Sequence, residues 1–138
     1  MKTSLLEKEA DWKSERMQNL RVAALIVGID NWEEYTLRLA KSILQEEPTT
    51  KLIVADNASQ TPYPTDLEEI RVLRTATRLN YSQAINLAKR EAGEQDWYIV
   101  LSNDVICMEM FHNHLAHFGE NWLLGGQLIS VPAVSVAV

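Results

Sequence analysis

The sequence contains few of the residues that mark several classes of protein. A single cysteine among 138 residues excludes an internal disulfide framework and a zinc finger built on cysteines. Five glycines and four prolines are too few for a collagen-like or low-complexity chain. No hydrophobic run approaches the roughly 20 residues that a membrane-spanning helix needs. We therefore expect an ordinary globular domain without a membrane span.

Basic residues are also scarce. The chain has 13 Lys and Arg against 19 Asp and Glu, a formal net charge of −6, and no basic stripe that would neutralise a nucleic-acid backbone. We expect no nucleic-acid partner, although a small anion could still be bound by a metal ion and oriented backbone amides. Charged residues interrupt the first 20 positions throughout, so they do not form a secretory signal. The expected location is cytoplasmic.

Short apolar runs alternate along the chain with segments of helical spacing. Residues 1–20 predict a separate amphipathic helix ahead of a domain spanning 21–138. In the helical segment 32–46, Tyr35, Leu39 and Ile43 fall on one side, the side expected to face the core. The order is typical of an α/β, Rossmann-like fold: a mostly parallel sheet with helices on both faces. The predicted strands are 22–27, 52–55, 70–74, 97–101 and 123–129, and the predicted helices are 32–46, 82–91 and 108–118.

Three of the predicted strands run into loops that contain an aspartate: Asp30, Asp56 and Asp104. In parallel sheets, ligands bind beyond the carboxyl ends of the strands. The chain has neither GxGxxG nor GxxxxGK[ST], so any phosphates would need another partner, such as a divalent metal held by one or two carboxylates. Asp104 is well placed for that role, and Asp56 could accept a hydrogen bond from a nucleobase imide.

Each aspartate also has a simpler interpretation. Asp56 and Asp104 could cap the turn or helix that follows them. We interpret Asp30-Asn31 as the N-cap of the next helix, because Glu33 and Glu34 follow in its first turn, where the helix dipole favours negative charge.

Several short segments share their order and spacing with one known family. A strand at Val22–Asp30 precedes a helix, and Asp56-Asn57-Ala58-Ser59 matches a D-N-x-S turn. Tyr81–Asn86 is similar to the end of N-x-G-Y-x-x-A-x-N, and Tyr98–Asp104 to a strand that carries a metal-binding acidic motif. With Leu124–Leu128 as the strand that follows, residues 21–130 resemble the opening, nucleotide-sugar-binding part of a family 2 glycosyltransferase of GT-A fold.

This resemblance implies a donor site at the strand ends. A metal ion, Mg²⁺ or Mn²⁺, would bind Asp104 and the diphosphate of a UDP- or dTDP-linked sugar, while Asp56 would contact the uracil- or thymine-like base. Val27, Gly28 and Ile29 would line the base pocket. The remaining donor-binding positions are Asn57, Arg78, Tyr81, Ser82, Asn86 and Asn103.

Three positions depart from the family pattern. Ser102 stands where the acidic motif often has its first aspartate, which leaves one carboxylate to anchor the metal. Asn80 stands where the family often has glycine, and we expect it to adopt the left-handed backbone that asparagine tolerates. Arg78 replaces an asparagine and could pair with a phosphate.

The resemblance implies transfer of the sugar to an acceptor hydroxyl with inversion. Family members usually continue well past the metal-binding strand, in a part that carries much of the acceptor site and the catalytic base. No residue here matches that base, so the acceptor and the base stay unknown. One alternative is a nucleotide-binding or scaffold module without transfer activity. Another is an interaction domain that forms a homo-oligomer through its N-terminal helix and the apolar tail Val131–Val138.

Overall fold

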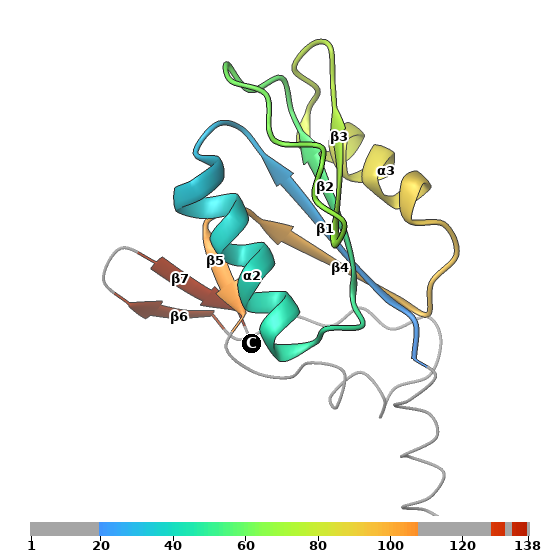
Figure 1. Ribbon diagram of the computed structural model, residues 1–138, viewed down its shortest axis with the longest axis vertical. Coiled ribbons are helices and arrows are strands. Elements are labelled where there is room, and N and C mark those ends of the chain that lie inside the picture. Colours follow the sequence, from blue (N-terminus) through green and yellow to red (C-terminus); the bar gives the residue numbers. More distant parts are fainter. Residues whose placement is uncertain (1–19, 108–127, 132–133, 138) are drawn as a thin grey trace, which may run out of the picture.

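The computed structural model describes residues 20–107, 128–131 and 134–137. Its centre is a four-stranded, fully parallel sheet with the strand order β3-β2-β1-β4 (Figure 1). The predicted alternation of strands and helices and the parallel sheet are confirmed. The strands are β1 (Val22–Gly28), β2 (Lys51–Asp56), β3 (Ile70–Arg74) and β4 (Trp97–Ser102), and the helical elements are η1 (Trp32–Thr36), α2 (Leu37–Glu46) and α3 (Tyr81–Ala92).

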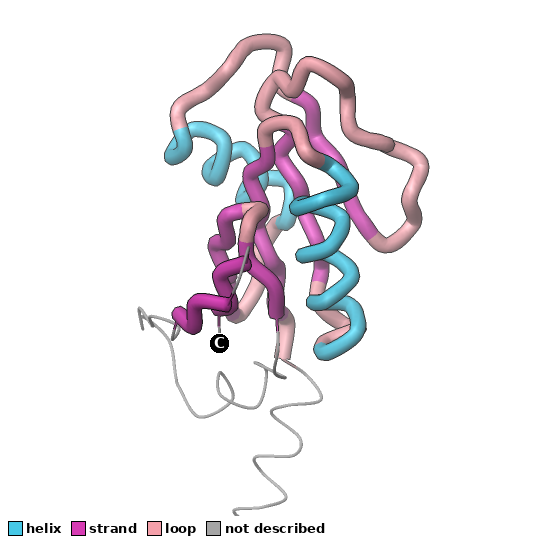
Figure 2. Tube along the Cα trace, turned by 90° about the vertical axis from the view of Figure 1, so that its left-hand side faces the viewer, coloured by secondary structure: helices cyan, strands magenta, loops and turns pink. Residues whose placement is uncertain are grey.

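Helices cover both faces of this sheet, as the apolar runs predict (Figure 2). Successive side chains of a strand point to opposite faces, so β1 serves two cores at once. Ala24 and Ile26 pack in one cluster with Leu39 and Ile43 of α2. On the other face, Leu25 packs in a cluster with α3. All seven residues of β1 are buried, which explains its uninterrupted apolar sequence.

A second, smaller sheet follows the first. Its strands are β5 (Val105–Cys107), β6 (Leu128–Val131) and β7 (Val134–Ala137), in the order β5-β7-β6. The predicted strand 123–129 overlaps β6 only at Leu128 and Ile129, because residues 123–127 lie outside the described part. The helix predicted over residues 108–118 also lies outside it, as do residues 1–19 of the helix predicted over residues 1–20. No helix in the described ranges is long and apolar enough to cross a membrane.

The helical segment after β1 differs from its prediction in phase. It opens with the π-helical turn η1, in which the Thr36 N–H donates to the Asn31 carbonyl, five residues back, at 3.4 Å. A π turn contains more residues than an α turn and rotates the side chains that precede α2. Thr36 is therefore fully buried, whereas Tyr35, predicted for the core side, is only half-buried.

Helix α3 has well-defined ends. The Asn80 side chain accepts from the Gln83 N–H, and the Gln83 side chain accepts from the Asn80 N–H, forming a capping box. Gly93, with φ of 74°, ends the helix as predicted. The left-handed conformation predicted for Asn80 is wrong: its φ and ψ are −71° and 166°, because an N-cap residue needs extended backbone to reach the first turn.

Candidate functional site

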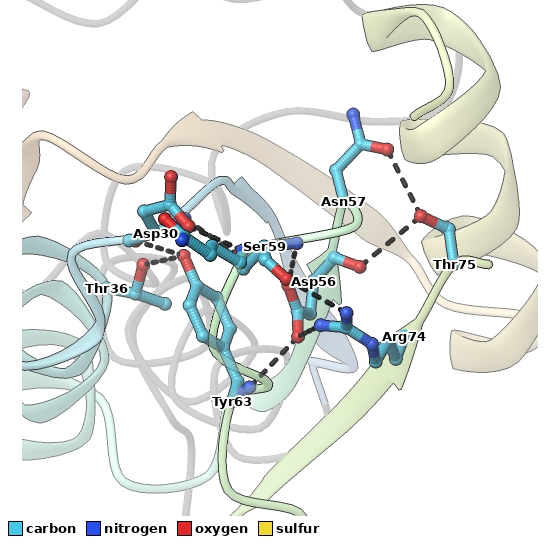
Figure 3. A network of polar contacts seen from close by, with 9 residues as sticks. Asp30, Thr36, Asp56, Asn57, Ser59, Tyr63, Arg74 and Thr75 are labelled. Carbon is cyan, nitrogen blue, oxygen red and sulfur yellow. Dashed lines mark hydrogen bonds and ion pairs between the residues drawn. The ribbon is translucent and has the colours of Figure 1, made fainter. Parts of the chain in front are cut away.

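The carboxyl ends of the four parallel strands lie level with one another. Gly28 pairs with Asp56, Asp56 with Arg74, and Val27 with Ser102. The loops that leave these strands therefore meet at one edge of the sheet, where Figure 3 shows a network of polar side chains. This edge holds most of the positions predicted from the sequence.

Asp56 is the centre of this network and has no exposed surface. One carboxylate oxygen accepts from the Ser59 N–H at 3.1 Å, and the other accepts from the Tyr63 N–H and the Arg74 guanidinium, both at 3.0 Å. Burial acts to raise the pKa of Asp56, but the hydrogen bonds from Ser59, Tyr63 and Arg74 outweigh it and hold the pKa below its usual range. The structure thus shows Asp56 organising its own turn, the simpler interpretation offered by the sequence.

Asp30 is held by the loop that Asp56 organises. Its N–H donates to the Ser59 hydroxyl at 2.7 Å, its carboxylate accepts from the Gln60 N–H at 2.8 Å, and its carbonyl accepts from the Tyr63 hydroxyl at 2.5 Å. Asp30 and Asn31 both adopt left-handed backbone, with φ of 55° and 52°. Such strain persists only where surrounding contacts impose it, and these three bonds do so.

The N-cap predicted at Asp30-Asn31 is confirmed at Asn31, which is the N-cap residue of η1. Its side chain makes no capping hydrogen bond; its carbonyl accepts from Tyr35 and Thr36 instead. The Asp30 carboxylate faces the neighbouring loop because the left-handed backbone turns it away from the helix.

Asn57 connects the β2 turn to the segment that precedes α3. Its side-chain nitrogen donates to the Leu79 carbonyl at 2.9 Å, and its oxygen accepts from the Leu79 N–H at 2.8 Å. The Thr75 hydroxyl donates to the same oxygen at 3.2 Å. Asn57 is almost fully buried, so it shapes the turn from inside the protein.

Tyr63 and Thr36 fill the space beside Gly28. A Cβ atom added to Gly28 would lie 2.5 Å from the Tyr63 hydroxyl and 2.8 Å from the Thr36 hydroxyl. The Thr36 hydroxyl donates to the Tyr63 hydroxyl, and the ring of Tyr63 packs against Trp32 with centroids 5.0 Å apart. Burial raises the pKa of Tyr63. Gly28 is therefore a close-contact position in this structure.

The other predicted positions lie nearer the solvent. Tyr81 is about half exposed, at 49%. Burial of part of its ring raises the pKa of Tyr81, and a hydrogen bond between its side chain and that of Ser102 acts in the opposite direction. Val27 is buried, Ile29 and Asn103 are half-buried, and Arg78, Ser82, Asn86 and Asp104 are exposed.

The sequence reasoning missed Tyr63, Thr36 and Arg74. Tyr63 lies in a polar loop that contains prolines, and Thr36 is a polar residue shortly after two glutamates. Neither residue therefore belongs to an apolar pattern. Arg74 carried a usable signal, because it ends a predicted strand whose neighbour ends in an aspartate. An ion pair across those strand ends would have predicted the partner of Asp56.

One carboxylate at this edge can serve as a metal ligand. Asp104 is exposed, and within the described ranges no group of three or more His, Cys, Asp or Glu side chains gathers to hold a metal ion. Mg²⁺ is often bound by only one or two carboxylates together with substrate phosphates and water. The Asp104 carboxylate fits such a site, in which the ligand completes the coordination.

No protein-family model and no curated protein matches the chain.

Proposed function

We propose that the chain binds a metal-complexed nucleotide sugar at this edge, as the donor-binding part of a GT-A-type glycosyltransferase. The supporting observation is the register of the parallel sheet, which sets the ends of its strands level with one another. The turn that carries Asp104 follows the end of β4, and Asn57, just after β2, holds Leu79, the residue after Arg78, through two hydrogen bonds. The exposed residues Asp104 and Arg78, a carboxylate for a metal ion and a guanidinium for a phosphate, thus come from loops at the same edge of the sheet.

The exposed groups suit a diphosphate better than the buried ones. Asp104 would hold Mg²⁺ or Mn²⁺, which would neutralise the charge of the diphosphate and favour its departure from the sugar. The planar guanidinium of Arg78 would bind phosphate oxygens in pairs. The hydroxyl of Ser82, in the first turn of α3, would donate to the same group.

Asp56 would support this site from within. A direct contact with a uracil or thymine base stays a prediction, and it would require exposure of a carboxylate that already accepts three hydrogen bonds. We assign Asp56 to holding the loop 57–63, on which the strained Asp30 depends. Transfer of the sugar to an acceptor hydroxyl with inversion follows from the family resemblance, and we assign no catalytic base.

A nucleotide-binding module without transfer activity is the second candidate. It is favoured by the isolation of the exposed Asp104 carboxylate, since in the described part of the chain Asp104 belongs to no cluster of metal ligands. With one carboxylate, metal affinity would depend on the nucleotide.

Binding can be tested by calorimetry and thermal unfolding with UDP, dTDP and their sugars, each with and without Mn²⁺. A ligand at 100 times its Kd should stabilise the fold by about 2.7 kcal/mol. We expect stabilisation by a uridine or thymidine diphosphate that requires Mn²⁺. Absence of any shift with every nucleotide would contradict the proposal.

The metal assignment predicts that Asp104→Asn lowers nucleotide affinity in Mn²⁺ by about tenfold or more, the scale of lost metal-site interactions. Affinity without metal should change little. Glu94→Gln is the matched control, because it removes one exposed negative charge just beyond the far end of α3. Equal effects of the two substitutions would reject Asp104 as the ligand. Release of free nucleoside diphosphate from a bound nucleotide sugar would separate transfer or hydrolysis from binding alone.

A further inference from the structure

A continuous chain of hydrogen bonds crosses the interior beneath the candidate site. The Asn103 side-chain amide donates to the Thr36 hydroxyl at 3.2 Å, and the Thr36 hydroxyl donates to the Tyr63 hydroxyl, also at 3.2 Å. The Tyr63 hydroxyl then donates to the Asp30 carbonyl at 2.5 Å. We call these four residues the hydroxyl relay; Figure 3 shows its Thr36–Tyr63–Asp30 part.

The direction of the hydroxyl relay is determined by its two ends. The amide nitrogen of Asn103 can only donate, and the carbonyl oxygen of Asp30 can only accept. Each hydroxyl between them therefore accepts one bond and donates the next, and bonds arranged in this way polarise and strengthen one another. Thr36 is fully buried and Tyr63 nearly so, at 3% exposure, so water cannot replace a lost partner at little cost.

The hydroxyl relay connects the two loops that the proposed function assigns to different parts of the ligand. At one end, Asn103 adjoins Asp104, the proposed metal ligand. At the other end, Asp30 belongs to the strained loop after Gly28, where the nucleobase would lie. Tyr63 belongs to the main core cluster, and Trp32 packs against that cluster and against the Tyr63 ring. This packing restrains the middle of the relay.

We infer that Tyr63 is a positioning residue: through Thr36 it sets the Asn103–Asp104 turn relative to the Asp30 loop, and so strengthens the dependence of metal binding and nucleotide binding on each other beyond their direct contact. This inference rests on the proposed function for the identity of the two ligands. The physical link between the loops can be measured without either ligand.

The ligand experiment compares UDP affinity with and without Mn²⁺ in the full chain. Tyr63→Phe keeps the ring but removes the central hydroxyl, and we expect the gain in affinity produced by Mn²⁺ to fall by about fivefold or more, the scale of a typical coupling between sites. Thr36→Val should act alike, and Thr36→Ser, which keeps a hydroxyl, should retain the gain. An equal loss of affinity with and without Mn²⁺ would show a merely structural role and overturn the inference.

Tyr98→Phe is the matched control. The Tyr98 hydroxyl donates to the Gly93 carbonyl and accepts from the Gln95 N–H, at the opposite edge of the sheet. Its removal also takes away a tyrosine hydroxyl, but from outside the hydroxyl relay. We expect this variant to keep the full Mn²⁺-dependent gain, and a loss equal to that of Tyr63→Phe would contradict the inference.

The ligand-free experiment follows the side-chain amide protons of Asn103 by NMR. Tyr63 does not bond to Asn103, yet Tyr63→Phe should shift these signals and speed their exchange with water, because Thr36 loses its acceptor and reorients. Unchanged Asn103 signals in folded Tyr63→Phe would overturn the inference. If the unaltered chain binds no nucleotide, the proposed function fails, and the Asn103 signals still decide whether the relay links the loops.

Discussion

At Gly28 the absence of a side chain is a packing requirement. The space that a Cβ would take is occupied by two buried hydroxyls, those of Tyr63 and Thr36, which are bonded to each other. Neither can retreat without breaking that bond. We predict that Gly28→Ala lowers the free energy of unfolding by about 1–3 kcal/mol, the usual cost of overpacking a core. Urea denaturation would measure this loss.

A double substitution identifies the cause. In a Tyr63→Phe background the shortest contact, 2.5 Å to the hydroxyl, is gone, so Gly28→Ala should cost less there. Gly93→Ala is the control, because its cost comes from a φ of +74° with no neighbouring atom within 4 Å, and Tyr63→Phe should not reduce it. An undiminished cost of Gly28→Ala in the Tyr63→Phe background would contradict this explanation.

Among the elements, α3 has the most clearly defined start. Asn80 and Gln83 satisfy each other's backbone N–H groups. We predict that Asn80→Ala lowers the free energy of unfolding by about 1 kcal/mol, the typical value of an N-cap. Asn80→Asp, which keeps an acceptor and adds a charge that the helix dipole favours, should retain the stability. Equal losses in both variants, measured in urea, would contradict the capping role.

The elements also show how far sequence patterns reach. The four strands of the main sheet could be predicted to within one residue at each end. The signal is clearest in β1 and β2, whose apolar runs are buried on both faces of the parallel sheet. The side of the helical segment after β1 that faces the core could not be predicted in the same way. Apolar spacing assumes a uniform α-helix. The π turn at Trp32–Thr36 instead follows two residues in left-handed backbone, Asp30 and Asn31, of which Asp30 is held by contacts to a distant loop.

The stability of the whole molecule in acid depends on Asp56, because its carboxylate joins β2, β3 and the loop between them. Its pKa is lower in the folded state than the value of about 3.9 usual in an unfolded chain. The stabilisation is therefore complete above pH of about 5 and is lost as the pH falls through the folded-state pKa. We predict that unfolding experiments between pH of about 5 and 2 show a steeper loss for the unaltered chain than for Asp56→Asn.

The same substitution should lower stability at neutral pH. It removes the carboxylate that accepts from the Arg74 guanidinium and from two backbone N–H groups, and a buried polar group left unsatisfied costs about 1–3 kcal/mol. The Arg74 side chain is partly exposed, so water can solvate its charge. Asp66→Asn, at an exposed position in the loop between β2 and β3, is the matched control and should leave both the stability and its pH dependence nearly unchanged. Identical pH profiles for Asp56→Asn and the unaltered chain would contradict the role assigned to Asp56.

The α/β alternation, the parallel sheet and the edge at which Asp30, Asp56 and Asp104 follow their strands can all be predicted from the amino-acid sequence. These features follow from apolar runs and turns, which are local and repeat along the chain. What the aspartates contact depends on how distant parts of the chain pack together. The partners of Asp56 and Asp30 include Arg74 and Tyr63, single residues 18 and 33 positions away, and an isolated polar residue carries no periodic signal of where it will pack.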